Sequence, residues 1–309
     1  MNPSRLITHC FKNDFCKTPT KPGKFDYILA PAIILVVLPM HSINPIQLLH
    51  SLKQHRTLIH SLIRRDVTGR YQGSMMGIMW SLVTPILMLC IYLFVFGVVF
   101  NPRRAGNHAS LGEVTLSLFC GMLVHSLFAE CLGRAPGIIV GQPNYVKKVV
   151  FPLETLSVIA VGSALFHYLI SLLVLLLFIL ALNGTVPVTA CLLPVIVLPV
   201  VLLGAGISWL ISALAVFLRD IGQITGLLGT ILLFLSPVFY KSSSIPEQYR
   251  FLLQLNPLTI PIELSRDVLL NGVLPNWSLL AVHTVASAAF CWMSYACFQK
   301  LRKGFADVL

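Results

Sequence analysis

Residue types that could carry out chemistry are scattered along this sequence, without the spacing of a catalytic or metal site. The eight cysteines form no Cys-x-x-Cys pair, and most lie in apolar stretches, as small buried side chains do. His125, His167 and His283 fall in different apolar segments, so we expect core or cavity-wall histidines, with a proton relay as the alternative. Glu130 precedes Arg134 by one helical turn, which predicts an ion pair. The sequence therefore predicts no catalytic residue and no metal.

The composition indicates a membrane protein. Of the 309 residues, 56% are hydrophobic and 11% are charged, whereas soluble domains carry roughly 25% charged residues. The mean hydropathy is +0.84, which excludes a disordered chain. Lys and Arg number 22 against 11 Asp and Glu, for a net charge of +11. In a bilayer protein this excess marks the cytoplasmic face, so we expect no nucleic-acid partner.

Apolar segments long enough to cross a bilayer predict an all-α integral membrane protein with six transmembrane helices. A hydrocarbon core of about 30 Å needs roughly 20 helical residues. The uncharged stretch 155–218 is long enough for two spans, divided by a turn at Asn183–Pro187. The predicted spans are about 76–100, 114–132, 156–182, 191–217, 221–240 and 279–298.

The distribution of Lys and Arg predicts that both termini lie in the cytoplasm. With that orientation the inner segments carry most of the basic residues, even when the far N-terminal tail is left out. The outer loops carry only Arg103, Arg104, Lys241, Arg250 and Arg266. We therefore predict a multi-pass membrane protein with its N- and C-termini on the same side.

Residues 1–39 form an extension of doubtful status. The apolar segment Ile28–Met40 is too short to span and contains Pro31 and Pro39. It is similar to a signal-peptide core, although no small-x-small cleavage site follows. The alternative is that translation starts at Met40.

Two basic segments outside the spans are predicted to be short helices. In region 40–72, Ile46, Leu49, Leu52 and Ile59 share one helical face. This segment is therefore expected to be an amphipathic helix that lies on the membrane surface. The other segment lies between the second and third spans. There Asn144 is expected to cap a short helix that Pro152 stops. The first segment could instead be a simple topology anchor, and the second could either dock on a soluble partner or be a solvated positive loop.

The longest outer loop, 241–276, is predicted to contain two short helices. Ser244 and Glu247 have the spacing of a capping box, which opens a helix that Asn256-Pro257 breaks. A second helix is expected to end at Asn271-Gly272. Because their apolar content suits a bilayer, we expect these helices to re-enter the outer leaflet and line a cavity.

At 62–100 the sequence LIRRDVTGRYQGSMMGIMWSLVTPILMLCIYLFVFGVVF resembles the start of the membrane subunits of ABC-2 type polysaccharide exporters, which move O-antigen, capsular polysaccharide and teichoic acid. NYVKKVVFP at 144–152 and FLRDIGQITGLLGTILLFLSPVFYKSSSIPEQYRFLLQLNPLT at 217–259 are also similar to that family. The resemblance covers about Pro45 to Leu309.

The resemblance implies a permease subunit (not an enzyme itself) of an ATP-driven exporter of lipid-linked cell-surface polysaccharide. Two copies would form the channel as a homodimer, and each would rest on one cytoplasmic ATPase subunit. The chain has no GxxxxGK[ST] loop, so it needs no cofactor of its own, and ATP with its magnesium ion would bind the partner. The family's interface helix corresponds here to a segment with Arg64, Arg65, Asp66, Arg70 and Tyr71. Its ATPase-coupling helix corresponds to a segment with Asn144, Tyr145, Lys147, Lys148, Phe151 and Pro152.

Aromatic side chains near the outer mouth are our candidates for the substrate path. Sugar faces stack on aromatic rings, although aromatics also mark membrane interfaces and ordinary helix packing. The candidates are Tyr92, Phe96, Phe100, Phe234, Phe239 and Tyr240. A type-2 exporter of drugs or lipids would have the same architecture and is the main alternative. A secondary transporter should show inverted repeats, and a membrane enzyme should show a clustered site; neither pattern is evident.

Overall fold

In the computed structural model the described residues are 45–99, 111–147, 151–240, 242 and 245–309. All of them belong to one of the chain's two compact units, Ser42–Leu309. The described part of this unit is helical. Its α-helices are α3 Pro45–Gln54, α4 Arg56–Arg70, α5 Trp80–Tyr92, α6 Leu111–Arg134, α7 Gly137–Val140, α8 Pro143–Lys147, α9 Glu154–Asn183, α10 Leu193–Phe217, α11 Ile221–Leu235, α12 Arg250–Leu255, α13 Thr259–Arg266, α14 Trp277–Leu301 and α15 Phe305–Val308.

Five helical segments of the described residues are long and apolar enough to cross a bilayer. They are Gly77–Phe96, Gly112–Arg134, Glu154–Asn183, Val188–Phe217 and Trp277–Val308. The predicted span 221–240 corresponds to α11, which ends at Leu235 and has only 15 residues. It ends early because Ser236 adopts an extended conformation and Pro237 has no N–H to continue the helix.

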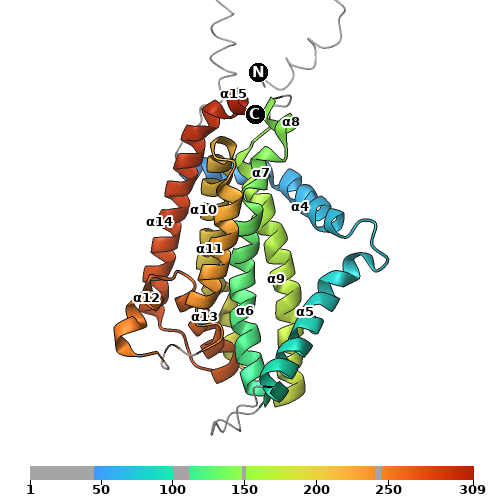
Figure 1. The fold of residues 1–309 in the computed structure, drawn as a ribbon, viewed down its shortest axis with the longest axis vertical. Coiled ribbons are helices and arrows are strands. Elements are labelled where there is room, and N and C mark those ends of the chain that lie inside the picture. The colour runs from blue at the N-terminus through green and yellow to red at the C-terminus, as the bar shows by residue number, and fades with distance from the viewer. Residues whose placement is uncertain (1–44, 100–110, 148–150, 241, 243–244) are drawn as a thin grey trace, which may run out of the picture. The chain divides into compact units, whose positions relative to one another are not determined.

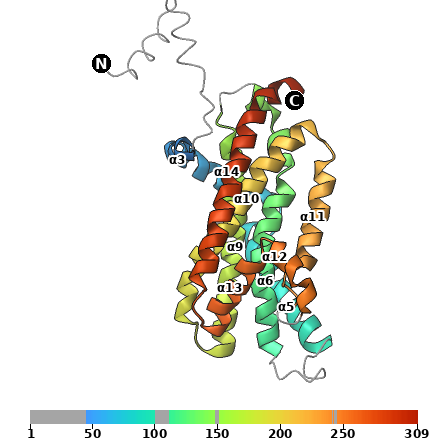
Figure 2. The same cartoon turned by 90° about the vertical axis from the view of Figure 1, so that its left-hand side faces the viewer.

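The bundle has two distinct ends. Helices α4, α7, α8 and α15 gather at one end, here called the α8 end, and α12 and α13 lie at the other, the α13 end (Figure 1). Helix α10 packs along α14, and α6 packs on α9 and α10 (Figure 2). A Cβ on Gly206 would lie 2.9 Å from the Phe290 ring and 3.1 Å from the Cys291 Cα. Glycine at this position therefore permits the close approach of α10 to α14, as small residues do in membrane bundles.

The amphipathic region is two helices rather than one. Helix α3 ends at Gln54 and α4 begins at Arg56, with a turn at His55 between them. Ile59 and Val67 of α4 are buried, while Ile46 and Leu49 of α3 are 72% and 66% exposed. Helix α4 therefore buries its apolar face more fully, packing on α9, whereas α3 packs only Leu48 and Leu52 against the core, and both stay partly exposed.

The two predicted outer helices exist, with adjusted ends. Helix α12 follows a 3₁₀ turn at Glu247–Tyr249 and stops before Asn256, as the Asn-Pro pair predicted. Helix α13 continues as a π-helix, Asp267–Asn271, which Gly272 ends with a φ of 66°. Ser244 of the predicted capping box lies outside the described residues.

Candidate functional site

The carboxylate of Glu154 joins three parts of the chain at the α8 end. Its Oε2 accepts a hydrogen bond from Arg302 Nη1 at 2.7 Å, and its Oε1 accepts one from Ser51 Oγ at 3.4 Å. Trp209 Nε1 donates to the Glu154 carbonyl at 3.0 Å. The carboxylate also lies in the first turn of α9, where the helix dipole favours negative charge. The buried residue Glu154 therefore connects four parts of the chain: α3, α9, α10 and the C-terminal segment, residues 302–309.

The segment predicted to couple to an ATPase lies beside this junction. Tyr145 of α8 packs its ring on Phe151 with centroids 4.6 Å apart, and its hydroxyl accepts a hydrogen bond from Arg65 Nη2 of α4 at 3.3 Å. Arg302 Nη2 donates to the Phe151 carbonyl at 3.2 Å. The structure therefore links the predicted coupling segment to both α4 and the C-terminal segment.

Four other members of that prediction take no part in these contacts or lie outside the described residues. Helix α8 begins at Pro143, so Asn144 lies inside the first turn and does not cap it. Proline is favoured at the first helical position because its missing N–H has no helical partner there. Lys147 is exposed and Pro152 is half-buried, while Lys148 lies outside the described residues.

A network of charges ties α4 to α6 and α9. Arg134 Nη2 donates to both carboxylate oxygens of Asp66 at 2.7 Å. Arg70 Nη2 donates to Glu130 Oε1 at 2.5 Å, and His167 Nδ1 lies 3.4 Å from the same oxygen. The predicted Glu130–Arg134 pair is present at 3.8 Å, but each residue has a closer partner on α4. His167, which we expected in the core or on a cavity wall, lies beside this charge network because α9 carries it next to α6.

The Asp66 carboxyl is held ionised by its surroundings. Burial alone would raise its pKa, but polar contact with Ser163, the hydrogen bonds from Arg134 and the positive charges of Arg134 and Arg70 lower the pKa below its usual value. The stabilisation from this carboxylate is therefore present above the ordinary aspartate pKa and is lost as pH falls through the lowered pKa. At neutral pH the tie between α4 and α6 is fully formed. Of the other predicted interface residues, Arg64 is exposed, and Tyr71 packs edge-on against the His167 ring at 6.0 Å.

The predicted path aromatics come together from two distant parts of the sequence. Successive ring centroids lie 6.4 Å apart for Tyr92–Phe96, 6.2 Å for Phe96–Phe239 and 6.1 Å for Phe239–Phe234. Tyr240 donates its hydroxyl proton to the Phe234 carbonyl at 3.1 Å. Phe100 lies outside the described residues. We refer to Tyr92, Phe96, Phe239 and Phe234 as the ring chain.

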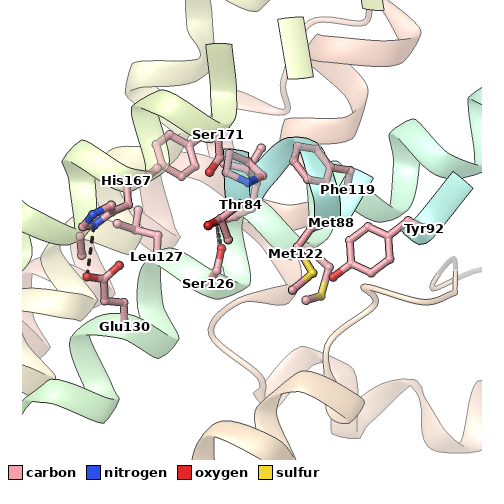
Figure 3. Close-up of a pocket in the computed structure, with 14 residues that line it drawn as sticks. Thr84, Met88, Tyr92, Phe119, Met122, Ser126, Leu127, Glu130, His167 and Ser171 are labelled. Carbon is pink, nitrogen blue, oxygen red and sulfur yellow. Dashed lines mark hydrogen bonds and ion pairs between the residues drawn. The ribbon is translucent and has the colours of Figure 1, made fainter. Parts of the chain in front are cut away.

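A cavity of about 280 Å³ lies between α5, α6 and α9, next to the ring chain. Figure 3 shows its graded lining, with Glu130 and His167 at one side, and Tyr92, Phe119 and Met122 at the other. Thr84, Ser126 and Ser171 supply hydroxyl groups between them. His167 Nε2 is buried without a hydrogen-bond partner. The cavity thus combines ring faces with hydrogen-bonding groups, which suits a hydroxyl-rich ligand.

Among the described residues, no cluster of three or more His, Cys, Asp or Glu could hold a metal ion. Sequence reasoning missed Glu154 and Arg302 as contributors, and it gave His167 no charged neighbour. Glu154 had a weak signal, because a carboxylate two residues after Pro152 and before a long apolar run suits a helix N-terminus. Nothing in the sequence paired it with Arg302, which lies 148 residues away.

The five long apolar helical segments of the described residues are those of a multi-pass membrane protein. The ABC-2 type transporter family model matches residues 57–270. Because that match covers more than half of the chain, the protein belongs to the ABC-2 type transporter family.

The alignments with individual relatives cover most of the length of each relative. The chain is 27% identical over 254 residues to the O-antigen export system permease protein RfbA of Klebsiella pneumoniae, covering 82% of this chain and 95% of that protein. It is 26% identical over 264 residues to the protein of the same name from Myxococcus xanthus, covering 85% and 99%. The polysialic acid transport protein KpsM of Escherichia coli is 23% identical over 221 residues, covering 70% and 83%.

Reversing the charge of Arg302 tests the junction at Glu154. Both side chains are largely buried, at 17% and 11% exposure, and breaking such a pair costs about 3 kcal/mol. We expect Arg302→Glu to lower the midpoint of thermal unfolding of the detergent-purified protein. Lys300→Glu, the same charge change at an exposed position two residues earlier, in the last turn of α14, is the control. Equal shifts for the two variants would contradict a structural role for the pair.

Proposed function

We propose that this chain is the permease subunit of an ATP-driven exporter that moves a lipid-linked cell-surface polysaccharide across the bacterial inner membrane. The observation that carries the proposal is the near full-length match to two proteins named O-antigen export permeases. The ring chain and the hydroxyl-lined cavity are consistent with it, because sugar faces stack on rings and sugar hydroxyls need hydrogen-bond partners. An ABC-2 exporter of drugs or lipids is the alternative function.

Six membrane crossings with both termini in the cytoplasm fit the arrangement of the helices. Helices α4 and α15 lie at the same end of the bundle (Figure 1), which requires an even number of crossings between them. The five long helices alone give an odd number. Helix α11 supplies the sixth crossing, although at 1.5 Å per residue it is about 22 Å long, short of the bilayer core. We infer that the re-entrant segment with α12 and α13 completes that crossing.

The α8 end is the proposed docking surface for one cytoplasmic ABC ATPase subunit, so that a homodimer would bind two copies. Helix α8 presents exposed Asn144 and Lys147, while Tyr145 ties the helix back to Phe151 and Arg65. A short helix held in this way can transmit the closing movement of an ATPase dimer to α4 and α9. ATP and its magnesium ion would bind the partner, since this chain has no phosphate-binding loop of the GxxxxGK[ST] kind.

A homodimer is proposed because the cavity among the described residues of one copy is small for a polymer and the ring chain extends beyond it to the surface. The cavity of about 280 Å³ is at the small end of ligand pockets. The ring chain lies at the surface of the single chain, where Phe234 is 66% exposed. A second copy facing α5 and α11 would close a channel lined by both ring chains.

Deleting this protein tests the proposed substrate. We expect surface polysaccharide to fall severalfold while polymer accumulates in the cytoplasm, measured by antibody or lectin staining of intact and permeabilised cells. Complementation with the wild-type chain serves as the control. Unchanged surface glycan together with a new drug sensitivity would instead favour the alternative exporter.

Replacing Lys147 and Lys148 by Glu tests the docking surface. We expect export to fall by about tenfold or more. If the two lysines face acidic groups of the ATPase, the glutamates would place like charges together, which costs several kcal/mol of binding free energy. The protein should still insert, and co-purification of the ATPase should fall with export. Lys53→Glu, an exposed position on α3, is the matched control. Normal surface polysaccharide in the double variant would count against coupling through α8.

Replacing Tyr92 and Phe96 by Ala tests the aromatic path. The loss of two rings removes stacking surface for the polymer but leaves the α8 end untouched. We therefore expect export to be impaired while ATPase binding is retained. The expected fall is about tenfold for each ring whose stacking on the polymer contributes about 1.4 kcal/mol. Ile91→Ala, an exposed apolar neighbour on the same helix, is the control. Normal polymer at the surface would contradict the path.

A further inference from the structure

Arg266 is a buried arginine in α13 whose guanidinium donates to three main-chain carbonyls. Nε donates to Ser117 O at 3.0 Å, Nη2 to Val238 O at 2.6 Å and Nη1 to Tyr240 O at 3.4 Å. The residue is only 8% exposed, although its sequence position had predicted an outer-loop charge. Its three acceptors come from α6 and from the segment that follows α11.

The Val238 and Tyr240 carbonyls need donors because α11 has ended. The last helical hydrogen bond there is from Ser236 N to Leu232 O at 2.9 Å, and Pro237 has no N–H with which to continue. Within a bilayer, such main-chain groups must be satisfied by the protein. Asn256 does the same at the start of this segment, where its Nδ2 donates to Ser236 Oγ at 2.9 Å. Two side chains from the α12–α13 region therefore hold the segment 236–240.

The two carbonyls in this segment that Arg266 binds flank Phe239. That ring lies between Phe96 of η2 (Leu93–Val99) and Phe234 of α11, with centroid separations of 6.2 and 6.1 Å. The third bond anchors the same guanidinium to α6, at Ser117. One side chain thus links the backbone on both sides of the Phe239 ring to the helix that lines the cavity.

The packing of the Arg266 guanidinium against α6 depends on a glycine of that helix. A Cβ on Gly121 of α6 would lie 3.0 Å from Arg266 Nη2 and 3.3 Å from the Val238 Cα. Both distances are shorter than ordinary van der Waals contacts, so even one methyl group would push the arginine or the segment away. A Cβ on Gly133 of the same helix would meet nothing within 4 Å.

We propose that Arg266 is a positioning residue for export, which holds Phe239 in the ring chain by binding the carbonyls on either side of it. This proposal rests on the proposed function, since it assigns Arg266 to the aromatic path of that function. Lysine cannot replace arginine here, because a single ammonium group lacks the planar fork that reaches separated acceptors.

Crosslinking reports the position of the segment independently of transport. In a full-length protein whose native cysteines are replaced by alanine, cysteines at 96 and 239 are joined in membranes with a short bifunctional thiol reagent. We expect Arg266→Lys and Gly121→Ala each to lower the crosslinking rate about tenfold, the equivalent of one hydrogen bond from a charged donor. Gly133→Ala and Arg219→Lys, an exposed arginine in the α10–α11 turn, should leave the rate unchanged.

A second cysteine pair at the α8 end shows whether a variant is folded. Cysteines at 145 and 151, whose native rings are 4.6 Å apart, should crosslink equally in all variants. An unchanged 96–239 rate in both Arg266→Lys and Gly121→Ala, with the 145–151 pair intact, would overturn the positioning role. A fall in the 145–151 rate in parallel would also overturn it, since it would show general misfolding.

Export measured in the same single variants, with native cysteines and aromatics present, separates this proposal from the proposed function. We expect Arg266→Lys and Gly121→Ala to reduce surface polysaccharide while the ATPase still co-purifies. If the crosslinking rate of the 96–239 pair falls but export is normal, Arg266 positions the segment 236–240, and the polysaccharide follows a path away from the ring chain. That result would contradict the assignment of Arg266 to export and the aromatic path together, and would leave family membership standing.

Discussion

A chain in hydrocarbon must satisfy its own main-chain hydrogen bonds, and this constraint explains most of the structure described above. Long helices meet it locally, which is why five uninterrupted helical segments dominate the bundle. Where α11 stops at Leu235, the helix can no longer meet it. There the carbonyls and hydroxyls of the following segment depend on Asn256 and Arg266, which α12 and α13 bring back from later in the chain. The outer helices are therefore needed to complete the bundle.

The opposite end is organised by side-chain charge. Glu154 with Arg302, Asp66 with Arg134, and Glu130 with Arg70 each join elements far apart in the sequence. All six residues are only partly accessible to water, so each carboxylate has a nearby cation that offsets its desolvation. As a result, α4, α8 and the C-terminal segment are connected to the long helices by directional bonds. A force applied at α8 would reach α4 through Arg65 and Tyr145.

Much of the fold could be predicted because the signals are local. Apolar runs, the Asn183–Pro187 turn and the Asn256-Pro257 break each act through nearby residues, and their helices appear where expected. The candidate site was harder to predict. Tyr92 and Phe96 could be grouped by helical spacing, but their contact with Phe239 depends on how η2 packs beside the end of α11. Helical spacing predicted the Glu130–Arg134 pair, but not the closer partners Arg70 and His167 of Glu130, because these lie on other helices.

The sequence by itself determined the class of protein, because hydropathy and charge distribution are properties of composition and order alone. It also marked α8 and the aromatic residues as candidates. Tertiary structure alone decided which charges pair, that His167 meets Glu130, and that Arg266 is buried beside α6 instead of lying in a loop. The physical reason is that a burial or a long-range hydrogen bond depends on the crossing of helices. No periodicity along one helix encodes where another will cross it.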